Sequence, residues 1–191
     1  MINIVRYFKS VIRKKIYESI IYADESIQVE IFSRLQDTYM KHKYMKFRKK
    51  YHIHENFRFN GNNILFYGDG IIECGENSYI GELSTVLADE NCKVVIGNNC
   101  SISHNVRIYT SSNVTDQIFS DKKREKHFGD VIIENGVWIG ANVFITPGVK
   151  IGSNSIVGAN SVVTKDIDRN AVFGGVPAKL IRYKKNSGES E

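Results

Sequence analysis

An aliphatic residue recurs at every sixth position over much of the C-terminal half of the chain. These positions are Ile133, Ile139, Ile145, Ile151, Val157 and Val163. A second series, four residues further on, comprises Val137, Val143, Val149, Ser155, Ser161 and Ile167. This period fits neither an α-helix nor a hairpin strand, whose faces repeat about every 3.6 and every 2 residues. It predicts a solenoid that winds as a prism, with one flat side per hexad and the aliphatic side chain pointing inward.

The same period recurs upstream in two blocks. One consists of Ile96, Ile102 and Ile108, and a looser one holds Ile80 and Val86. Between residues 109 and 131 the period fails, and the chain there is polar and charged. A long polar loop that leaves a solenoid usually serves function, and a tolerated surface insertion is the alternative.

Residues 1–60 differ from the rest of the chain. They contain no Gly and no Pro, which favours helix, and they hold 13 Lys and Arg against 6 Asp and Glu. An apolar stripe at helical spacing consists of Val5, Phe8, Ile12, Ile16 and Ile20. The stripe would pack on the protein's own body, a sister subunit or a partner synthase, or it would lie on an anionic membrane surface. Nucleic acid is the least favoured partner because no recognised binding motif accompanies the charge.

These features divide the chain into three parts. A basic helical segment covers residues 1–60, a mainly β solenoid with its excursion at 109–131 covers residues 61–183, and a polar tail covers 184–191. The three cysteines, Cys74, Cys92 and Cys100, are scattered and suggest neither a disulfide framework nor a metal knuckle. No apolar run approaches the roughly 18–20 residues that span a bilayer, and no secretory signal is evident, so we expect a cytoplasmic protein.

The blocks "VWIGANVFI", "GANSVVTKDI" and "GGVPAKLIR" within residues 131–182 resemble the hexapeptide-repeat acyltransferases. The closest subgroup is that of the maltose, galactoside and surface-polysaccharide O-acetyltransferases, and the resemblance covers about residues 61–183. It implies a left-handed parallel β-helix, a homotrimer with sites in the clefts between subunits, and acetyl-CoA as co-substrate. It also implies a sugar hydroxyl or an amine as acceptor, a histidine as general base, and no metal.

The general base is the uncertain part of this resemblance. The histidine of the sugar acetyltransferases falls on Asn113, whose amide cannot act as a base near neutral pH. His127, later in the excursion, is one substitute, and a lapsed enzyme is another explanation. We favour His104, which follows inward Ile102 by two residues and is therefore expected at an outward corner. A hexad of this kind resembles the one that carries the base in sialic-acid and bacillosamine N-acetyltransferases.

The resemblance also implies residues for the two substrates. Trp138 would be the aromatic residue at the reaction centre, or simply a surface aromatic covered by a neighbour. The small residues along the pantetheine arm would be Gly140, Ala141 and Ala159. The residues at the nucleotide end would be Thr164 and Lys165, followed by two cations for the CoA phosphates, Lys179 and Arg182. Possible acceptor contacts are Tyr109, Asn113 and Asp116.

Three functions follow from these residues. The leading hypothesis is acetyl-CoA-dependent O-acetylation of a sugar hydroxyl, in a bacterial surface polysaccharide or its precursor. The second is N-acetylation of an amino-sugar nucleotide, which the position of His104 supports. The third is a non-catalytic solenoid scaffold, which Asn113 supports. A zinc lyase is set aside, because it would need about three histidine ligands around one cleft. Only His104 and His127 occur beyond residue 60.

Overall fold

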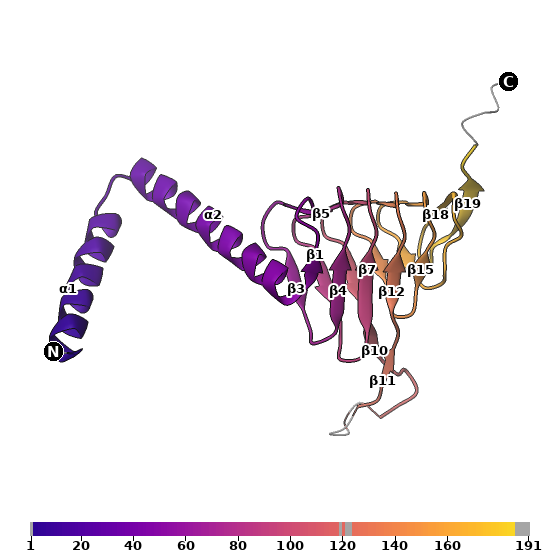
Figure 1. Cartoon of the computed structure of the whole chain (residues 1–191), viewed down its shortest axis with the longest axis horizontal. Coiled ribbons are helices and arrows are strands. Elements are labelled where there is room, and N and C mark those ends of the chain that lie inside the picture. The colour runs from indigo at the N-terminus through magenta and orange to yellow at the C-terminus, as the bar shows by residue number, and fades with distance from the viewer. Residues whose placement is uncertain (1, 119, 121–123, 186–191) are drawn as a thin grey trace. The chain divides into compact units, whose positions relative to one another are not determined.

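The computed structural model describes residues 2–118, 120 and 124–185 and divides the chain into two compact units, residues 1–44 and 45–191. The first unit is helical and holds α1 (Ile2–Ile21) and most of α2 (Glu25–Lys50) (Figure 1). The Asp24 carboxylate caps α2 by accepting hydrogen bonds from the Ser26 amide at 2.9 Å and the Ser26 hydroxyl at 2.7 Å. Within the described residues, no helix is long and apolar enough to cross a membrane.

The second unit is a parallel β-solenoid in which each coil contributes one strand to each of three sheets. The first two coils consist of β1 (His52–Ile53), β2 (Arg58–Asn60), β3 (Leu65–Tyr67), β4 (Ile71–Cys74), β5 (Tyr79–Gly81) and β6 (Thr85–Leu87). The third consists of β7 (Lys93–Ile96), β8 (Ser101–Ile102) and β9 (Arg107–Tyr109). The fourth and fifth consist of β12 (Val131–Ile133), β13 (Trp138–Ile139), β14 (Phe144–Ile145), β15 (Lys150–Ile151), β16 (Ile156–Val157) and β17 (Val162–Val163).

The hexad aliphatics form the core, as the period predicts. Ile102 pairs with Ile80 on one neighbouring coil and with Ile139 on the other, and all three are 0% exposed. Burying a side chain of this size contributes about 1.5–3 kcal/mol, so a stack repeated on three sheets stabilises the solenoid along its length. The expected fold class, a mainly β hexapeptide-type solenoid with an N-terminal helical segment, is confirmed.

The solenoid begins earlier than the expected boundary at residue 61, because β1 and β2 precede it. The core of this first coil is mainly aromatic, with Ile64 as a buried aliphatic residue beside the rings. Phe57 and Phe66 are 1% and 2% exposed, and Phe47 at the end of α2 stacks on Phe66 with ring centroids 5.5 Å apart. An aromatic core does not follow the aliphatic six-residue period, which explains why the sequence pattern missed this coil.

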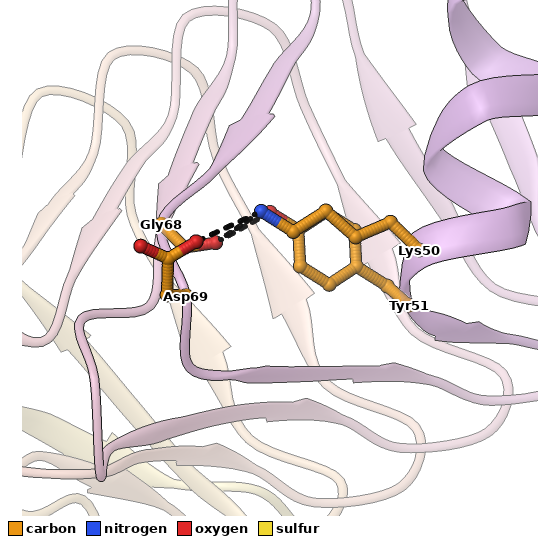
Figure 2. A network of polar contacts seen from close by, with 4 residues as sticks. All are labelled: Lys50, Tyr51, Gly68 and Asp69. Atoms are coloured by element: carbon orange, nitrogen blue, oxygen red, sulfur yellow. Dashed lines mark hydrogen bonds and ion pairs between the residues drawn. The ribbon is translucent and has the colours of Figure 1, made fainter.

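Within the second unit, polar contacts join Lys50, the last residue of α2, and Tyr51 to the first coils (Figure 2). The Lys50 ammonium donates to the Gly68 carbonyl at 2.8 Å and to the Asp69 carboxylate at 3.2 Å. The Tyr51 hydroxyl donates to the same carbonyl at 2.9 Å. Gly68 has a φ of +100°, and an added Cβ would lie 1.9 Å from the Ala88 carbonyl oxygen, so only glycine fits this contact.

One corner of the solenoid repeats a left-handed backbone conformation in every coil. Its members are Asn63, Leu83, Asn105, Asn142 and Asn160, with φ of +58°, +61°, +55°, +58° and +58°. Asparagine tolerates this conformation. The Asn105 amide donates to Asn142 at 2.8 Å, and Asn142 donates to Asn160 at 3.0 Å, so the asparagines also form a ladder. Leu83 is the exception in this column.

Replacing Leu83 with asparagine should raise the free energy of unfolding by about 1 kcal/mol, because a bulky residue in the left-handed region costs about 1–2 kcal/mol. Leu83 is 51% exposed, so little buried apolar surface is lost with it. Urea denaturation of the two proteins measures the difference. The reverse change at the same corner, Asn160→Leu, is the matched control and should lower stability; a gain in both variants would contradict the strain at Leu83.

The excursion and the C-terminus complete the unit. The excursion is an antiparallel hairpin of β10 (Ser111–Asn113) and β11 (Lys126–Phe128). After the fifth coil, β18 (Ala171–Gly174) pairs parallel with β16, and β19 (Lys179–Tyr183) turns back antiparallel to β18. Most of the expected polar tail, residues 186–191, lies outside the described residues.

Candidate active site

His104 lies at the asparagine corner, in the turn after β8, with an exposed side chain. Its Nδ1 is 3.3 Å from the Ser103 hydroxyl oxygen. Its carbonyl accepts a hydrogen bond from the Asn142 amide at 3.1 Å, and the carbonyl of Ala141 accepts one from the Asn160 amide at 2.8 Å. These bonds set His104, Ala141 and Ala159 in one column along the solenoid, one residue per coil.

A second column, of very small residues, runs beside the first. Its members are Gly81, Ser103, Gly140 and Gly158, and the last three directly precede His104, Ala141 and Ala159. A Cβ added to Gly140 would lie 2.6 Å from the Ala159 amide nitrogen, and one added to Gly81 would lie 2.6 Å from the His104 amide nitrogen. Two adjacent columns without side-chain bulk leave a smooth backbone surface that extends from His104 over the next two coils.

Trp138 stands on the same sheet as these columns. It lies in β13, where it pairs with Ser101 on one side and Ile156 on the other, and its side chain is 54% exposed. Its indole therefore projects outward from the coil that carries Gly140 and Ala141. An exposed tryptophan beside a smooth backbone surface is suited to cover an elongated ligand.

The hairpin and the residues next to it carry His127 and the predicted acceptor contacts. Asn113 is paired with Lys126, and His127 is paired with Ser112, and both predicted side chains are exposed. Asp116 is exposed beyond β10, while Tyr109 packs edge-to-face on Phe144 with centroids 5.3 Å apart. Among the residues that the structure describes, no hydrogen bond joins His104 to the hairpin.

Gln117 closes the loop that joins β10 to β11, a role that the sequence analysis did not predict. Its side-chain amide donates to the carbonyls of Val114 at 2.6 Å and Glu125 at 2.9 Å. Its carbonyl oxygen accepts from the Glu125 amide at 2.7 Å. No local sequence signal marks this role, because the bonds depend on how the loop closes.

The C-terminal cations surround an open pocket. The pocket has a volume of about 630 Å³ and is lined by Ile156, Arg182, Tyr183, Lys184 and Lys185. Arg182 was predicted here, whereas Lys179, Thr164 and Lys165 are exposed but do not line the pocket. The additional residues, Tyr183 to Lys185, directly follow the "GGVPAKLIR" block, so continuing that block by three residues would have found them.

Two of the additional residues are held by hydrogen bonds to neighbouring coils. The Lys184 ammonium donates to the Asn154 side-chain oxygen at 2.6 Å. The Tyr183 hydroxyl donates to the Asp168 carboxylate at 3.0 Å, and this bond raises the pKa of Tyr183 above its usual value. One of the three cations that line the pocket, Lys184, is therefore held in place, and the cationic lining suits a phosphate-bearing ligand.

A carboxylate fastens the fourth coil, which carries Trp138, to the fifth. Glu134 accepts from the Lys150 ammonium at 2.8 Å, from the Ser153 amide at 2.9 Å and from the Ser153 hydroxyl at 2.7 Å. The bond from Lys150, followed by those from Ser153, lowers the pKa of Glu134 to about 2. The ionised carboxylate of Glu134 is thus the form that makes these contacts between the fourth and fifth coils.

Replacing Glu134 with glutamine should destabilise the protein at pH 7 by on the order of 1 kcal/mol, since charge-assisted bonds are replaced at a partly exposed site. A lowered folded-state pKa means that the contribution is complete above the ordinary value of 4.5 and is lost as the pH falls towards about 2. Denaturation of both proteins at pH 7 and pH 3 should show a smaller difference at pH 3; a constant difference would contradict the assignment.

Known proteins resemble this chain in the same solenoid region. The family model for the bacterial transferase hexapeptide, with six repeats, matches residues 130–165. The chain is 40% identical over 116 residues to the galactoside O-acetyltransferase of Escherichia coli strain K12, covering 61% of this chain and 55% of that protein. A maltose O-acetyltransferase structure from Clostridium difficile 630 is 34% identical, with a TM-score of 0.55, and covers 69% of this chain and 72% of its own.

The chain belongs to the hexapeptide-repeat acyltransferase family. Another solved member of this family, a galactoside acetyltransferase in complex with coenzyme A, is 27% identical with a TM-score of 0.64. That similarity covers 90% of this chain and 78% of the solved one. The chain spans about half the length of the curated hexapeptide-repeat relatives that it matches. The family resemblance expected from the three sequence blocks is thus confirmed.

Proposed function

We propose that the protein is an acetyl-CoA-dependent O-acetyltransferase that acts on a sugar hydroxyl of a bacterial surface polysaccharide or its precursor. The observation that carries this proposal is the alignment of His104 with Ala141 and Ala159 beside a column of glycine and serine. This arrangement offers one exposed base at the end of a smooth track, and Trp138 stands over the same sheet. The E. coli galactoside O-acetyltransferase and the CoA-bound galactoside acetyltransferase support the class of acceptor and the co-substrate.

The residues suggest a direct transfer with His104 as general base. With its proton on Nδ1, near the Ser103 hydroxyl, the imidazole presents an unprotonated Nε2 to the surface. Nε2 would take the proton of the sugar hydroxyl as that oxygen attacks the thioester carbonyl. The same proton would then pass to the departing CoA sulfur, so the base is regenerated. The track of Gly140, Ala141 and Ala159 would align the thioester with the base.

The cationic pocket would receive the phosphates of CoA. Its lining includes three cations, Arg182, Lys184 and Lys185. Three exposed residues outside the pocket would contact the nucleotide of CoA, and these are Lys179, Thr164 and Lys165. On the acceptor side, Asn113, Asp116, Tyr109 and His127 would contact the sugar. We further propose a homotrimer, in which the excursion of one subunit would approach the His104 corner of another.

Thiol release from acetyl-CoA, measured with galactosides, maltose and capsular glycans, tests the proposed activity. Turnover with at least one neutral sugar is the expected result. CoA alone at 100 times its dissociation constant should stabilise the protein by about 2.7 kcal/mol. A chain that shows neither turnover nor stabilisation by CoA would instead be a scaffold.

N-acetylation of an amino-sugar nucleotide is the second candidate, and the corner position of His104 favours it. An amine acceptor arrives partly protonated and also needs a base. Release of thiol with UDP-amino sugars but not with neutral sugars would favour this candidate over O-acetylation.

A further inference from the structure

Helix α1 exposes an apolar stripe on the surface of the first unit. Ile12 and Ile16 are 53% and 56% exposed, and Ile20 continues the same face with partial exposure. Positions four apart in a helix lie one above the other, so these side chains form one continuous strip. An uncovered strip of large aliphatic side chains indicates a surface that binds something apolar.

The charges of α1 from Arg13 to Glu18 lie off this stripe. Arg13 and Lys15 lie on its two flanks by helical position, whereas Lys14 and Glu18 lie on the opposite face and pair at 3.9 Å. The helix sequence contains five Lys and Arg residues and a single acidic one, Glu18. The helix is therefore strongly cationic, and its one carboxylate points away from the stripe.

This combination separates three possible occupants, which are a second copy of α1, a nucleic acid and a bilayer surface. A second copy of α1 packed stripe to stripe would bring Arg13 and Lys15 against like charges, whereas helical pairs use opposite charges beside the seam. A nucleic acid would match the charge but would leave the stripe in water. A bilayer surface with anionic lipids buries the stripe and neutralises both flanks.

We propose that α1 lies in the plane of an anionic lipid surface, with Ile12, Ile16 and Ile20 in the acyl region and Arg13 and Lys15 at the headgroups. The long stems of Arg13 and Lys15 suit this position, because they extend along apolar surface while the charge stays at the headgroup level. The inference does not depend on the proposed acetyltransferase activity.

Co-sedimentation of the full chain with vesicles tests the proposal. Vesicles of phosphatidylcholine with a third phosphatidylglycerol should bind the protein, and pure phosphatidylcholine should bind it much less. Ile16→Ser should weaken the binding at least ten-fold, since an isoleucine loses its apolar burial. The matched control is Ile21→Ser, which removes an isoleucine of the same helix that lies off the stripe and is 46% exposed.

Charge variants provide a second, independent readout. Lys15→Gln should weaken binding about five-fold, which corresponds to about 1 kcal/mol per cation at the surface. Lys14→Gln makes the same change on the opposite face and should have a smaller effect. Binding that is equal for both vesicle types, or unaffected by Ile16→Ser, would overturn the proposal. So would a loss of oligomeric mass on Ile16→Ser, by analytical ultracentrifugation, in a protein that binds no vesicles, because α1 would then pack on a second copy.

Discussion

Replacing His104 with alanine is expected to lower the rate of acetyl transfer about 10²–10⁴-fold, the usual contribution of a positioned general base. The fold should survive, because the side chain is exposed and its only described hydrogen bond is the 3.3 Å contact with the Ser103 hydroxyl. The column that aligns His104 with Ala141 is made by backbone bonds, which alanine keeps. Affinity for CoA should therefore change little, and thiol release with a saturating acceptor measures the effect on the rate.

His127→Ala is the matched control, because it removes the other histidine beyond residue 60 from an exposed position on β11. A much smaller loss of rate is expected there, and a moderate rise in KM for the acceptor would fit a contact with the sugar. The assignment fails if His127→Ala abolishes turnover while His104→Ala leaves it intact. Asn113→His adds a histidine at the position where the sequence resemblance implies the base; rescue of the His104→Ala protein by this change would support a hairpin that reaches the reaction centre.

Replacing Ile133 with alanine is expected to cost about 2–5 kcal/mol of unfolding free energy, the range for a large-to-small change in a packed core. Ile133 is 0% exposed and stacks between Ile96 and Ile151 on the neighbouring coils. Its loss opens a cavity at the centre of the solenoid, next to the turn that leads to Trp138. Equilibrium denaturation in urea measures the change, and the midpoint should fall with little change in slope.

The adjacent residue Ile132 provides the control on the same strand. It points to the opposite face of β12 and is only partly buried, so Ile132→Ala should cost less than about 1 kcal/mol. The two variants remove the same atoms one residue apart and differ only in the direction of the side chain. Equal losses would contradict the assignment of inward and outward positions from which the columns at His104 and Gly140 follow.

The solenoid fold and its inward-facing positions could be predicted from the sequence, because the six-residue period is local. Each hexad supplies one flat side, so Ile139, Ile145 and Ile151 reveal the inward direction without any knowledge of distant residues. The six-residue period did not predict the first coil, because its interior is filled mainly by Phe57 and Phe66, together with Phe47 of α2. Those rings come from separated segments, and a local period does not record such a cluster.

The site was predictable only in part. The corner position of His104 follows from its distance to Ile102, and the small residues at Gly140, Ala141 and Ala159 follow from the family blocks. Residues such as Gln117, Tyr183 and Lys184 have partners that only the folded chain identifies. The isolated sequence contains no signal for such bonds, since glutamine and lysine are mostly exposed in proteins and tyrosine is of intermediate burial.

The sequence by itself determined that this chain is a hexapeptide solenoid with a cationic helical segment, because hexad spacing and helix composition act over a few residues. Only the tertiary structure decided which coil lies on which. The excursion separates Asn105 from its ladder partner Asn142 by 37 residues, whereas Asn142 and Asn160 are 18 apart. Stacking across that excursion depends on backbone hydrogen bonds between coils. Those bonds place His104 in the same column as Ala141 and Ala159, on the coil before them.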